Sequence, residues 1–264
     1  MLLNQFVFRI FGFLSHRDFG NKFLLKYNIK ASKEQESQYI SLGLDRSLGL
    51  MKLNTTLYKL YGKTYSETNG MWSEHLILFS AISESSYKIE TILEIGTFNG
   101  ETTRILSHLF PLAAIETYDL PLSDIEKDKK YKYAVKNKQI IKERQSNFID
   151  LQNVQFIENN SILITQTRKK YDLVWLDGDH SYPVVTIDIF NSIKQISKKG
   201  LVICDDVYVS SVQADKSGRS SASFETLTVL NKVNLISYVL IQKRLGFFYN
   251  YPKSYKKYLG IFWL

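Results

Sequence analysis

The sequence contains very little cysteine, histidine or proline. Its 264 residues include one cysteine (Cys204), four histidines and four prolines. A single cysteine excludes an intramolecular disulfide and any metal site built from several cysteine ligands. With so few histidines, a metal ion would have to be held mainly by carboxylates, the ligands that Mg²⁺ and Ca²⁺ prefer.

Long hydrophobic runs are also missing. No stretch reaches the roughly 18 uncharged apolar residues that a membrane-spanning helix needs. The nearest approach is segment 1–14, but Arg9 interrupts it and no basic region precedes it. We interpret this segment as a buried or interfacial helix rather than a signal peptide. The expectation is therefore a cytoplasmic protein, with peripheral membrane contact through this segment left open.

Composition favours a folded globular protein with a basic surface. Hydrophobic residues make up 44 % and charged residues 23 % of the chain, which excludes disorder as its main state. The formal net charge is +8, which favours anionic partners such as nucleic acid, anionic lipid or phosphorylated substrates. Solubility is the simpler interpretation of this charge, so nucleic acid is not the expected partner.

Short β-rich runs alternate with helical patterns from residue 91 onward, which predicts βαβ units and a parallel sheet. Helices are expected at 103–110 and from 184 to an end signal at Gly200. Two further runs read as an antiparallel pair at the sheet edge. We predict a Rossmann-like α/β fold with seven strands, helices on both faces, an N-terminal helical extension (1–72) and a main domain (73–264). The predicted strands are 91–95, 113–120, 154–158, 171–177, 200–206, 235–242 and 246–251.

A charged segment lies between the second and third predicted strands. Residues 127–144 carry eight basic and two acidic side chains. A solvated helix face is the simpler interpretation, and a basic lid over a substrate is the alternative.

A glycine-containing turn follows the first predicted strand. Gly96 and Gly100 lie between that strand and the helix after it, where glycine lets the backbone approach a ligand closely. Ligands of open α/β sheets bind at the carboxyl ends of the strands. Asp119 ends the next strand, where its carboxylate can accept hydrogen bonds from both hydroxyls of a ribose. The turn and the acid together indicate a nucleoside site.

Acidic residues also end the fourth and fifth predicted strands. Asp177, Asp179 and His180 follow the fourth, while Asp205 and Asp206 follow the fifth. Adjacent strands lie about 4.8 Å apart, so these carboxylates can meet and repel one another. A divalent cation would remove that conflict, which predicts a metal site. In the alternative interpretation the acids are solvated or paired with Lys and Arg.

Four motifs carry a resemblance to a known family: LEIGTFNGETT at 93–103, NNS at 159–161, WLDGDHSY at 175–182 and VICDDV at 202–207. With these motifs the chain resembles class I S-adenosylmethionine-dependent methyltransferases. It is most similar to the D-G-D-H-x-Y branch, which includes sugar and small-molecule O-methyltransferases. The resemblance implies that the cofactor-binding residues are Glu94, Gly96, Thr97, Gly100, Asp119, Asn160, Ser161 and Asp177. It also implies Mg²⁺ or another divalent cation on Asp177, Asp205 and Asp206, with Asp179 or His180 as general base.

The function implied is metal-dependent methyl transfer to a hydroxyl of a small molecule or a glycan sugar. Formation of homo-oligomers is left open. Metal coordination would lower the pKa of that hydroxyl, and the base would remove its proton. Two alternatives stay open. One is methyl transfer to nitrogen, protein or nucleic acid. The other is a hydroxylase-like or non-catalytic member of the same fold.

Overall fold

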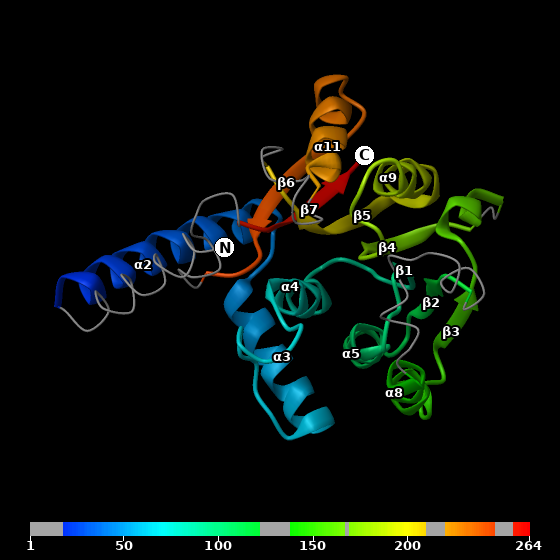
Figure 1. Ribbon diagram of the computed structural model, residues 1–264, viewed down its shortest axis with the longest axis horizontal. Coiled ribbons are helices and arrows are strands. Elements are labelled where there is room, and N and C mark those ends of the chain that lie inside the picture. The colour runs from blue at the N-terminus through cyan, green and yellow to red at the C-terminus, as the bar shows by residue number, and fades with distance from the viewer. Residues whose placement is uncertain (1–17, 122–137, 167–168, 210–219, 246–255) are drawn as a thin grey trace.

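The computed structural model describes residues 18–121, 138–166, 169–209, 220–245 and 256–264. Within them lies a seven-stranded sheet of order β3-β2-β1-β4-β5-β7-β6 (Figure 1). Neighbouring strands pair in parallel except at β7, which runs antiparallel to both β5 and β6. The strands are β1 (Thr91–Ile95), β2 (Ala114–Asp119), β3 (Val154–Glu158), β4 (Tyr171–Leu176), β5 (Ile196–Val207), β6 (Ser237–Gln242) and β7 (Tyr258–Trp263). This is the Rossmann-like methyltransferase fold that the sequence predicts.

Two boundaries differ from the prediction. The helix expected to end near Gly200 ends earlier, and β5 begins immediately after it at Ile196. Gly200 lies within β5, where a Cβ would approach the Asp172 carbonyl oxygen to 2.9 Å, so this glycine serves close strand packing. The predicted strand 246–251 lies outside the described residues, and within those residues the seventh strand is β7.

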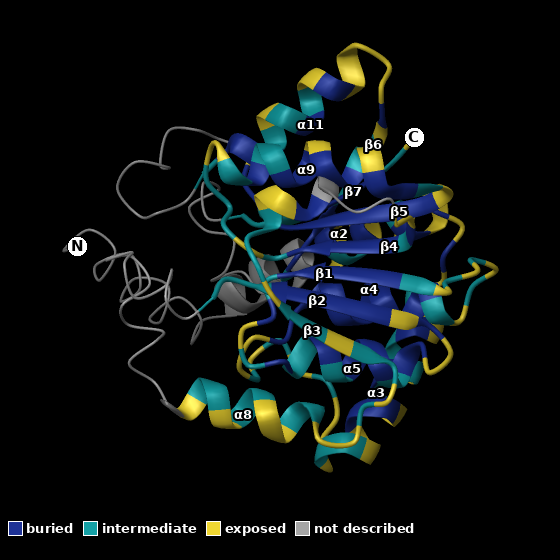
Figure 2. Ribbon diagram, turned by 90° about the vertical axis from the view of Figure 1, so that its right-hand side faces the viewer, coloured by how far each residue is buried: buried dark blue, intermediate teal, exposed yellow. Residues whose placement is uncertain are grey.

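Helices cover both faces of the sheet (Figures 1 and 2). One apolar cluster joins α3, α4 and α5 to one face, and a second joins α9 and α11 to the other. Successive residues of a strand point to opposite faces, so Leu173 and Trp175 enter the first cluster while Val174 and Leu176 enter the second. These helices are α3 (Arg46–Tyr61), α4 (Glu74–Ser83), α5 (Glu101–Leu109), α9 (Val184–Gln195) and α11 (Ala222–Lys232).

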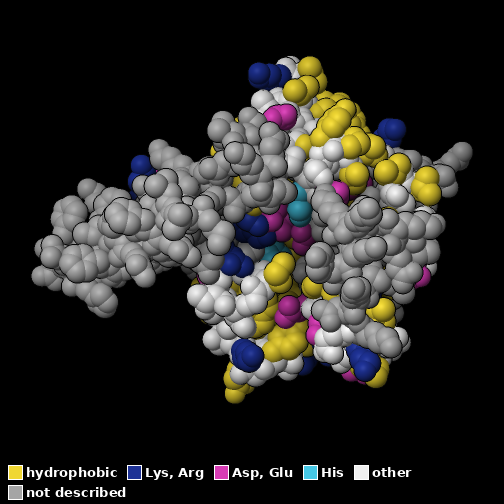
Figure 3. Space-filling view, viewed as in Figure 1, with side chains coloured by type: hydrophobic (Ala, Val, Ile, Leu, Met, Phe, Trp, Pro, Cys, Tyr) yellow, Lys and Arg dark blue, Asp and Glu magenta, His cyan; other side chains and the backbone are white. Residues whose placement is uncertain are grey.

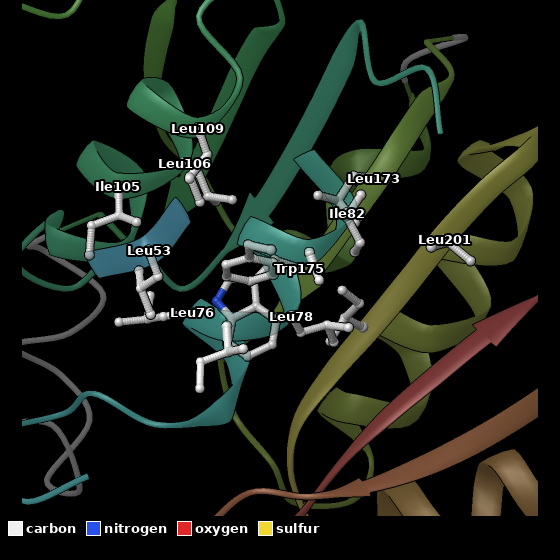
Figure 4. Close-up of a cluster of buried hydrophobic side chains, with 14 of the residues drawn as sticks. Leu53, Leu76, Leu78, Ile82, Ile105, Leu106, Leu109, Leu173, Trp175 and Leu201 are labelled. Atoms are coloured by element: carbon white, nitrogen blue, oxygen red, sulfur yellow. The ribbon is translucent and has the colours of Figure 1, made fainter. Parts of the chain in front are cut away.

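Helix α4 is buried on every side, including its polar residues. Its residues Glu74 to Ile82 are all buried, because α3 packs over the side that faces away from the sheet. At the sheet, the His75 ring stacks on Trp175 with 5.2 Å between ring centroids, and Trp175 is labelled within the apolar cluster of Figure 4. Burial lowers the pKa of His75 to about 3, so this histidine is neutral.

The N-terminal helix α2 (Asp18–Ser41) is anchored to the main domain by polar contacts. Tyr39 donates a hydrogen bond of 2.8 Å to Glu74, and Arg46 of α3 pairs with the same carboxylate at 2.6 Å. Gln35 donates to the carbonyl of Gln242 at 2.8 Å. The division of the chain at residue 72 stays a prediction, as does the nature of segment 1–14, which lies outside the described residues. None of the described helices is long and apolar enough to cross a membrane.

Candidate active site

The carboxyl ends of β1 and β4 meet at Gly96. Its φ is +100°, and a Cβ at this position would lie 2.2 Å from the carbonyl oxygen of Asp177. The amide of Asp177 in turn donates to the carbonyl of Ile95 at 2.8 Å. Glycine is required here because the two chain segments after the strands cross in contact. This crossing places the first predicted site segment against the D-G-D-H segment.

Glu94 lies beneath this turn and is fully buried. Its Oε2 accepts hydrogen bonds from Thr103 and, at 2.6 Å, from Thr117. Its Oε1 is buried and has no hydrogen-bond partner among the described residues. Burial raises the pKa of Glu94 to about 7. A buried oxygen without a partner is costly, so Oε1 fits a ligand that brings a donor such as an ammonium group.

Thr97 is buried and bonds Thr117 through its hydroxyl at 2.6 Å, so its side chain supports Glu94 from within. Gly100 lies at the start of α5 with a φ of +77°. A Cβ at Gly100 would lie 2.6 Å from the ring of Phe148, so this glycine allows helix α8 (Lys138–Phe148) to pack closely. The predicted cofactor residues of this turn are therefore brought together, but Thr97 and Gly100 shape the turn rather than present polar side chains.

Asp119 ends β2 as predicted and is already well hydrogen-bonded. It accepts from the amides of Phe98 at 3.0 Å and Leu120 at 2.9 Å, and from the Arg144 guanidinium at 2.7 Å. Burial raises the pKa of Asp119, an effect that outweighs the lowering by Arg144. Arg144 belongs to α8 and also donates to the carbonyl of Phe98 at 2.5 Å. One side chain of the charged segment 127–144 thus reaches the site, while residues 127–137 lie outside the described residues.

Asn160 and Ser161 follow β3 at the same edge of the sheet. The amide of Asn159 donates to the carbonyl of Asp119 at 2.9 Å, which places this segment beside the end of β2. The side chain of Asn160 accepts from the amide of Ile162 at 3.0 Å and so caps the 3-10 helix η1 (Ser161–Gln166). The two residues lie where the sequence predicts, with the Asn160 side chain used in the turn.

The D-G-D-H segment follows β4. His180 Nε2 lies 3.5 Å from Asp177 Oδ1, and the two side chains are 27 % and 32 % exposed. Burial and the charge of Asp205 raise the pKa of Asp177. Burial alone would lower the pKa of His180, but the contact with Asp177 raises it above its usual value. Asp179 accepts hydrogen bonds from the Ser181 hydroxyl and, at 2.8 Å, from the Ser181 amide.

Asp205 and Asp206 lie in an irregular stretch near the end of strand β5. In a regular strand their side chains would point to opposite faces of the sheet. The register between β5 and β7 shifts between Cys204 and Val207, and Asp206 has a φ of +48°. This bulge turns both carboxylates toward one partner, Lys243.

Lys243 and Lys257 hold these two carboxylates. Lys243 Nζ lies 2.5 Å from Asp205 Oδ2 and 2.7 Å from Asp206 Oδ1, and Lys257 pairs with the other oxygen of Asp206. Lys243 follows β6 and Lys257 precedes β7, with the Lys243 amide donating to the Lys257 carbonyl at 2.9 Å. Because β7 is antiparallel to β5 and β6, this end of the β6–β7 pair lies at the carboxyl end of β5.

The predicted divalent-cation site on Asp177, Asp205 and Asp206 is not supported by this geometry. In the described part of the chain, no group of three or more His, Cys, Asp and Glu residues could hold a metal ion. Lys243 is a buried residue, and its ammonium lies between Asp205 and Asp206. Although burial alone would raise the pKa of Asp205, the charge of Lys243 lowers it below its usual range. The alternative interpretation, in which these acids pair with lysines, is confirmed for Asp205 and Asp206.

Sequence reasoning did not single out the two lysines. They lie among many others in a basic chain, and the only signal was the position of Lys243 directly after the predicted strand 235–242. In Figure 3, basic, acidic and histidine side chains gather in a hollow at the centre of the face shown.

A separate cavity of about 870 Å³ lies at the amino ends of the strands, lined by residues that include Glu90, Asp172 and Gly200. This cavity is at the opposite end of the strands from the candidate site residues.

Comparison with known families adds the decisive observation. A family model described as a methyltransferase domain matches residues 93–207, which span the strand ends from Glu94 to Asp206. The chain carries a methyltransferase domain over these residues. A comparison with curated protein sequences found no match.

Solved structures similar to this methyltransferase show its fold in other proteins. A Klebsiella pneumoniae protein described as an O-methyltransferase has a TM-score of 0.51 at 16 % identity, over 82 % of this chain and 89 % of that chain. The O-methyltransferase TomG from Streptomyces achromogenes, involved in tomaymycin synthesis and solved in complex with SAM, has a TM-score of 0.50 at 15 % identity, over 88 % and 97 %. A Clostridium thermocellum protein described as an rRNA methylase has a TM-score of 0.50 at 11 % identity, over 73 % and 96 %.

Proposed function

We propose that this methyltransferase transfers the methyl group of S-adenosylmethionine to a hydroxyl of a small molecule or a glycan sugar. The observation that carries the proposal is the Asp177–His180 pair, which follows β4 beside the end of β1 with Glu94, while Asp119 ends β2 on the other side of β1. Transfer to a neutral hydroxyl calls for a base beside the cofactor, and this pair supplies one. The O-methyltransferase descriptions of two structural relatives agree with this choice of acceptor.

The cofactor brings an activated methyl group on a sulfonium, so the protein mainly has to orient the two reactants. Glu94 would bind the ammonium of its methionine part through Oε1, the buried oxygen without a partner. Asp119 would accept hydrogen bonds from the ribose hydroxyls at the end of β2. Asn160 and Ser161 would lie beside the adenine, because the segment after β3 is bonded to the carbonyl of Asp119.

His180 is the favoured general base. Its imidazole lies at hydrogen-bonding range from Asp177, which orients the ring and stabilises the imidazolium formed when it takes a proton. Asp179 is the second candidate, but its carboxylate is engaged by Ser181. The bound cofactor would supply the methyl group, whose bond to sulfur would be replaced by a bond to the acceptor oxygen, with a neutral thioether as the leaving group. His180 would take the proton of the acceptor hydroxyl.

No step of this mechanism uses a divalent metal, because Lys243 and Lys257 hold the carboxylates predicted to bind it. Homo-oligomer formation and membrane contact through segment 1–14 stay predictions.

The cofactor assignment is tested by calorimetry with S-adenosylhomocysteine. Replacing Asp119 with Ala removes an ionised acceptor, and we expect at least a tenfold loss of affinity. Arg144→Gln is the matched control, since it alters the partner of Asp119 but leaves the carboxylate in place. Equal affinities for wild type and Asp119→Ala would refute this part of the proposal.

The acceptor class is tested with a labelled methyl donor and a panel of sugars, phenols, amines, protein and RNA. We expect incorporation into hydroxyl compounds, and a fall of roughly a hundredfold or more in His180→Gln at unchanged S-adenosylhomocysteine affinity. His108→Gln, a histidine on α5 that bonds the carbonyl of Arg104, is the control. Incorporation into amines or RNA alone would favour the nitrogen or nucleic-acid alternative.

A further inference from the structure

The three carboxylates that the sequence points to as metal ligands do not form a cation-binding group. We propose that the ammonium of Lys243 permanently takes the place of a divalent cation at this edge of the sheet, so that the protein binds no divalent metal between Asp205 and Asp206. The pairing of Lys243 with Asp205 and Asp206 does not depend on which acceptor the protein methylates. Only the consequence of this pairing for methyl transfer rests on the proposed function.

The geometry is that of a bridging cation. Nζ of Lys243 lies 2.5 Å from an oxygen of Asp205 and 2.7 Å from an oxygen of Asp206, so a single ammonium joins the two carboxylates. Lys257 pairs with the second oxygen of Asp206 from the solvent side, with a side chain 40 % exposed. The second oxygen of Asp205 is buried without a partner among the described residues.

The charges balance without a metal. Two carboxylates carry two negative charges, and the two ammonium groups supply the same positive charge as one divalent ion. A metal ion entering between Asp205 and Asp206 would have to displace Lys243 and would be repelled by both lysines. Carboxylates that are close together favour a divalent cation chiefly because they repel each other, and here that repulsion is already relieved.

The backbone fixes Lys243 in this position. Its amide donates to the carbonyl of Lys257 at 2.9 Å, and its carbonyl accepts from the amide of Glu74 at the start of α4 at 3.2 Å. Its side chain is 10 % exposed, so the ammonium has little room to turn into solvent. The resident cation is therefore built into the junction of α4 with the β6–β7 pair.

For the reaction, Lys243 is a positioning residue. It holds the carboxylate of Asp205 at the end of β5, next to the end of β4 that leads to Asp177, and Asp177 in turn contacts His180. The removal of the acceptor proton then depends on His180 or Asp179 rather than on a metal-bound hydroxyl. Methyl transfer by the wild-type protein is accordingly expected to stay within twofold when a chelator is added.

Binding of Mn²⁺, followed by electron paramagnetic resonance and calorimetry, tests the inference without reference to methyl transfer. The variants are Lys243→Met, which keeps an apolar side chain of similar length, and Lys243→Met combined with Lys257→Met. We expect wild type to show no Mn²⁺ binding that depends on Asp205. The variants should bind Mn²⁺ at least tenfold more tightly, and adding Asp205→Asn should remove the gain.

Lys52→Met is the matched control, because Lys52 pairs with Glu84 at 2.7 Å on the surface of the N-terminal helices. It should bind Mn²⁺ as wild type does. The inference is overturned if wild type binds Mn²⁺ as tightly as Lys243→Met and loses it with Asp205→Asn. It is also overturned if folded Lys243→Met, checked by circular dichroism, binds no more tightly than Lys52→Met.

Should Lys243→Met fail to fold, wild type and Asp205→Asn decide the question between them. Equal, weak Mn²⁺ binding by both supports the inference, and binding by wild type alone overturns it. Failure of the proposed function would look different. In that case no hydroxyl compound would accept the labelled methyl group, while the Mn²⁺ results would stand unchanged.

Discussion

The site has two halves, one at the ends of β1 and β2 and one at the end of β5. Both contain buried carboxylates at the same edge of the sheet, but their pKa values are shifted in opposite directions. At the ends of β1 and β2, burial raises the pKa of Glu94 and of Asp119, and one oxygen of Glu94 has no partner among the described residues. At the end of β5, Lys243 lowers the pKa of Asp205 and bridges it to Asp206. The first half is ready for a ligand that brings hydrogen-bond donors. In the second half, Lys243 and Lys257 already balance the charge of the two carboxylates, although one oxygen of Asp205 also has no partner among the described residues.

The largest loss of unfolding free energy is expected when the Asp205 carboxylate, which pairs with Lys243, is removed. Asp205→Ala leaves the buried ammonium of Lys243 with Asp206 alone, and such a change costs about 4 kcal/mol of unfolding free energy. Urea unfolding measures the loss. Glu84→Ala is the control, because it breaks a half-exposed surface pair with Lys52 and should cost less than about 1 kcal/mol. Similar small losses in both variants would show that the Lys243 bridge contributes little.

Substitution of Gly96, where the segments after β1 and β4 are in contact, should lower the free energy of unfolding nearly as much. In Gly96→Ala the new Cβ would meet the carbonyl of Asp177 at 2.2 Å in a left-handed conformation, and we expect a loss of about 3 kcal/mol. Gly62 has a similar positive φ of +66° but open space around it, so Gly62→Ala should cost only about 1 kcal/mol. Thermal and urea unfolding measure both. Equal losses would mean that the contact with Asp177 relaxes freely.

The smallest effect concerns the pH response of the ligand-ready half. The folded-state pKa of Glu94 is about 7, above its usual 4.5, so ionised Glu94 destabilises the free protein as pH rises toward 7. A ligand ammonium on Oε1 favours the ionised form. The affinity for S-adenosylhomocysteine should therefore increase about tenfold from pH 6 to pH 8, roughly one pKa unit of free energy.

Calorimetry of wild type and Glu94→Gln across this range measures the effect. The amide does not titrate, so the slope should vanish in Glu94→Gln. A slope that persists in this variant would assign the pH response to another group, and a flat wild-type profile would exclude the ammonium contact.

Local sequence patterns predicted most of the sheet. The first five strands and the helices α5 and α9 follow from apolar periodicity, glycine and proline signals, which act over a few neighbouring residues. The predicted strand 246–251 lies outside the described residues, whereas the strand Tyr258–Trp263 was not predicted. This second short apolar run is identified as a strand only by its pairing with β5 and β6.

The sequence by itself determined that acids would lie at the ends of three of the strands, β2, β4 and β5, and a parallel sheet places those strand ends at one edge. It also determined the glycine at the β1–β4 crossing. Tertiary structure alone decided which acids remain available. Lys243 lies 38 residues from Asp205 along the chain, and it reaches that carboxylate only because β7 inserts antiparallel between β5 and β6. A bulge then turns Asp206 to the same ammonium. Such pairings arise from strand order and backbone irregularity, which local patterns do not encode.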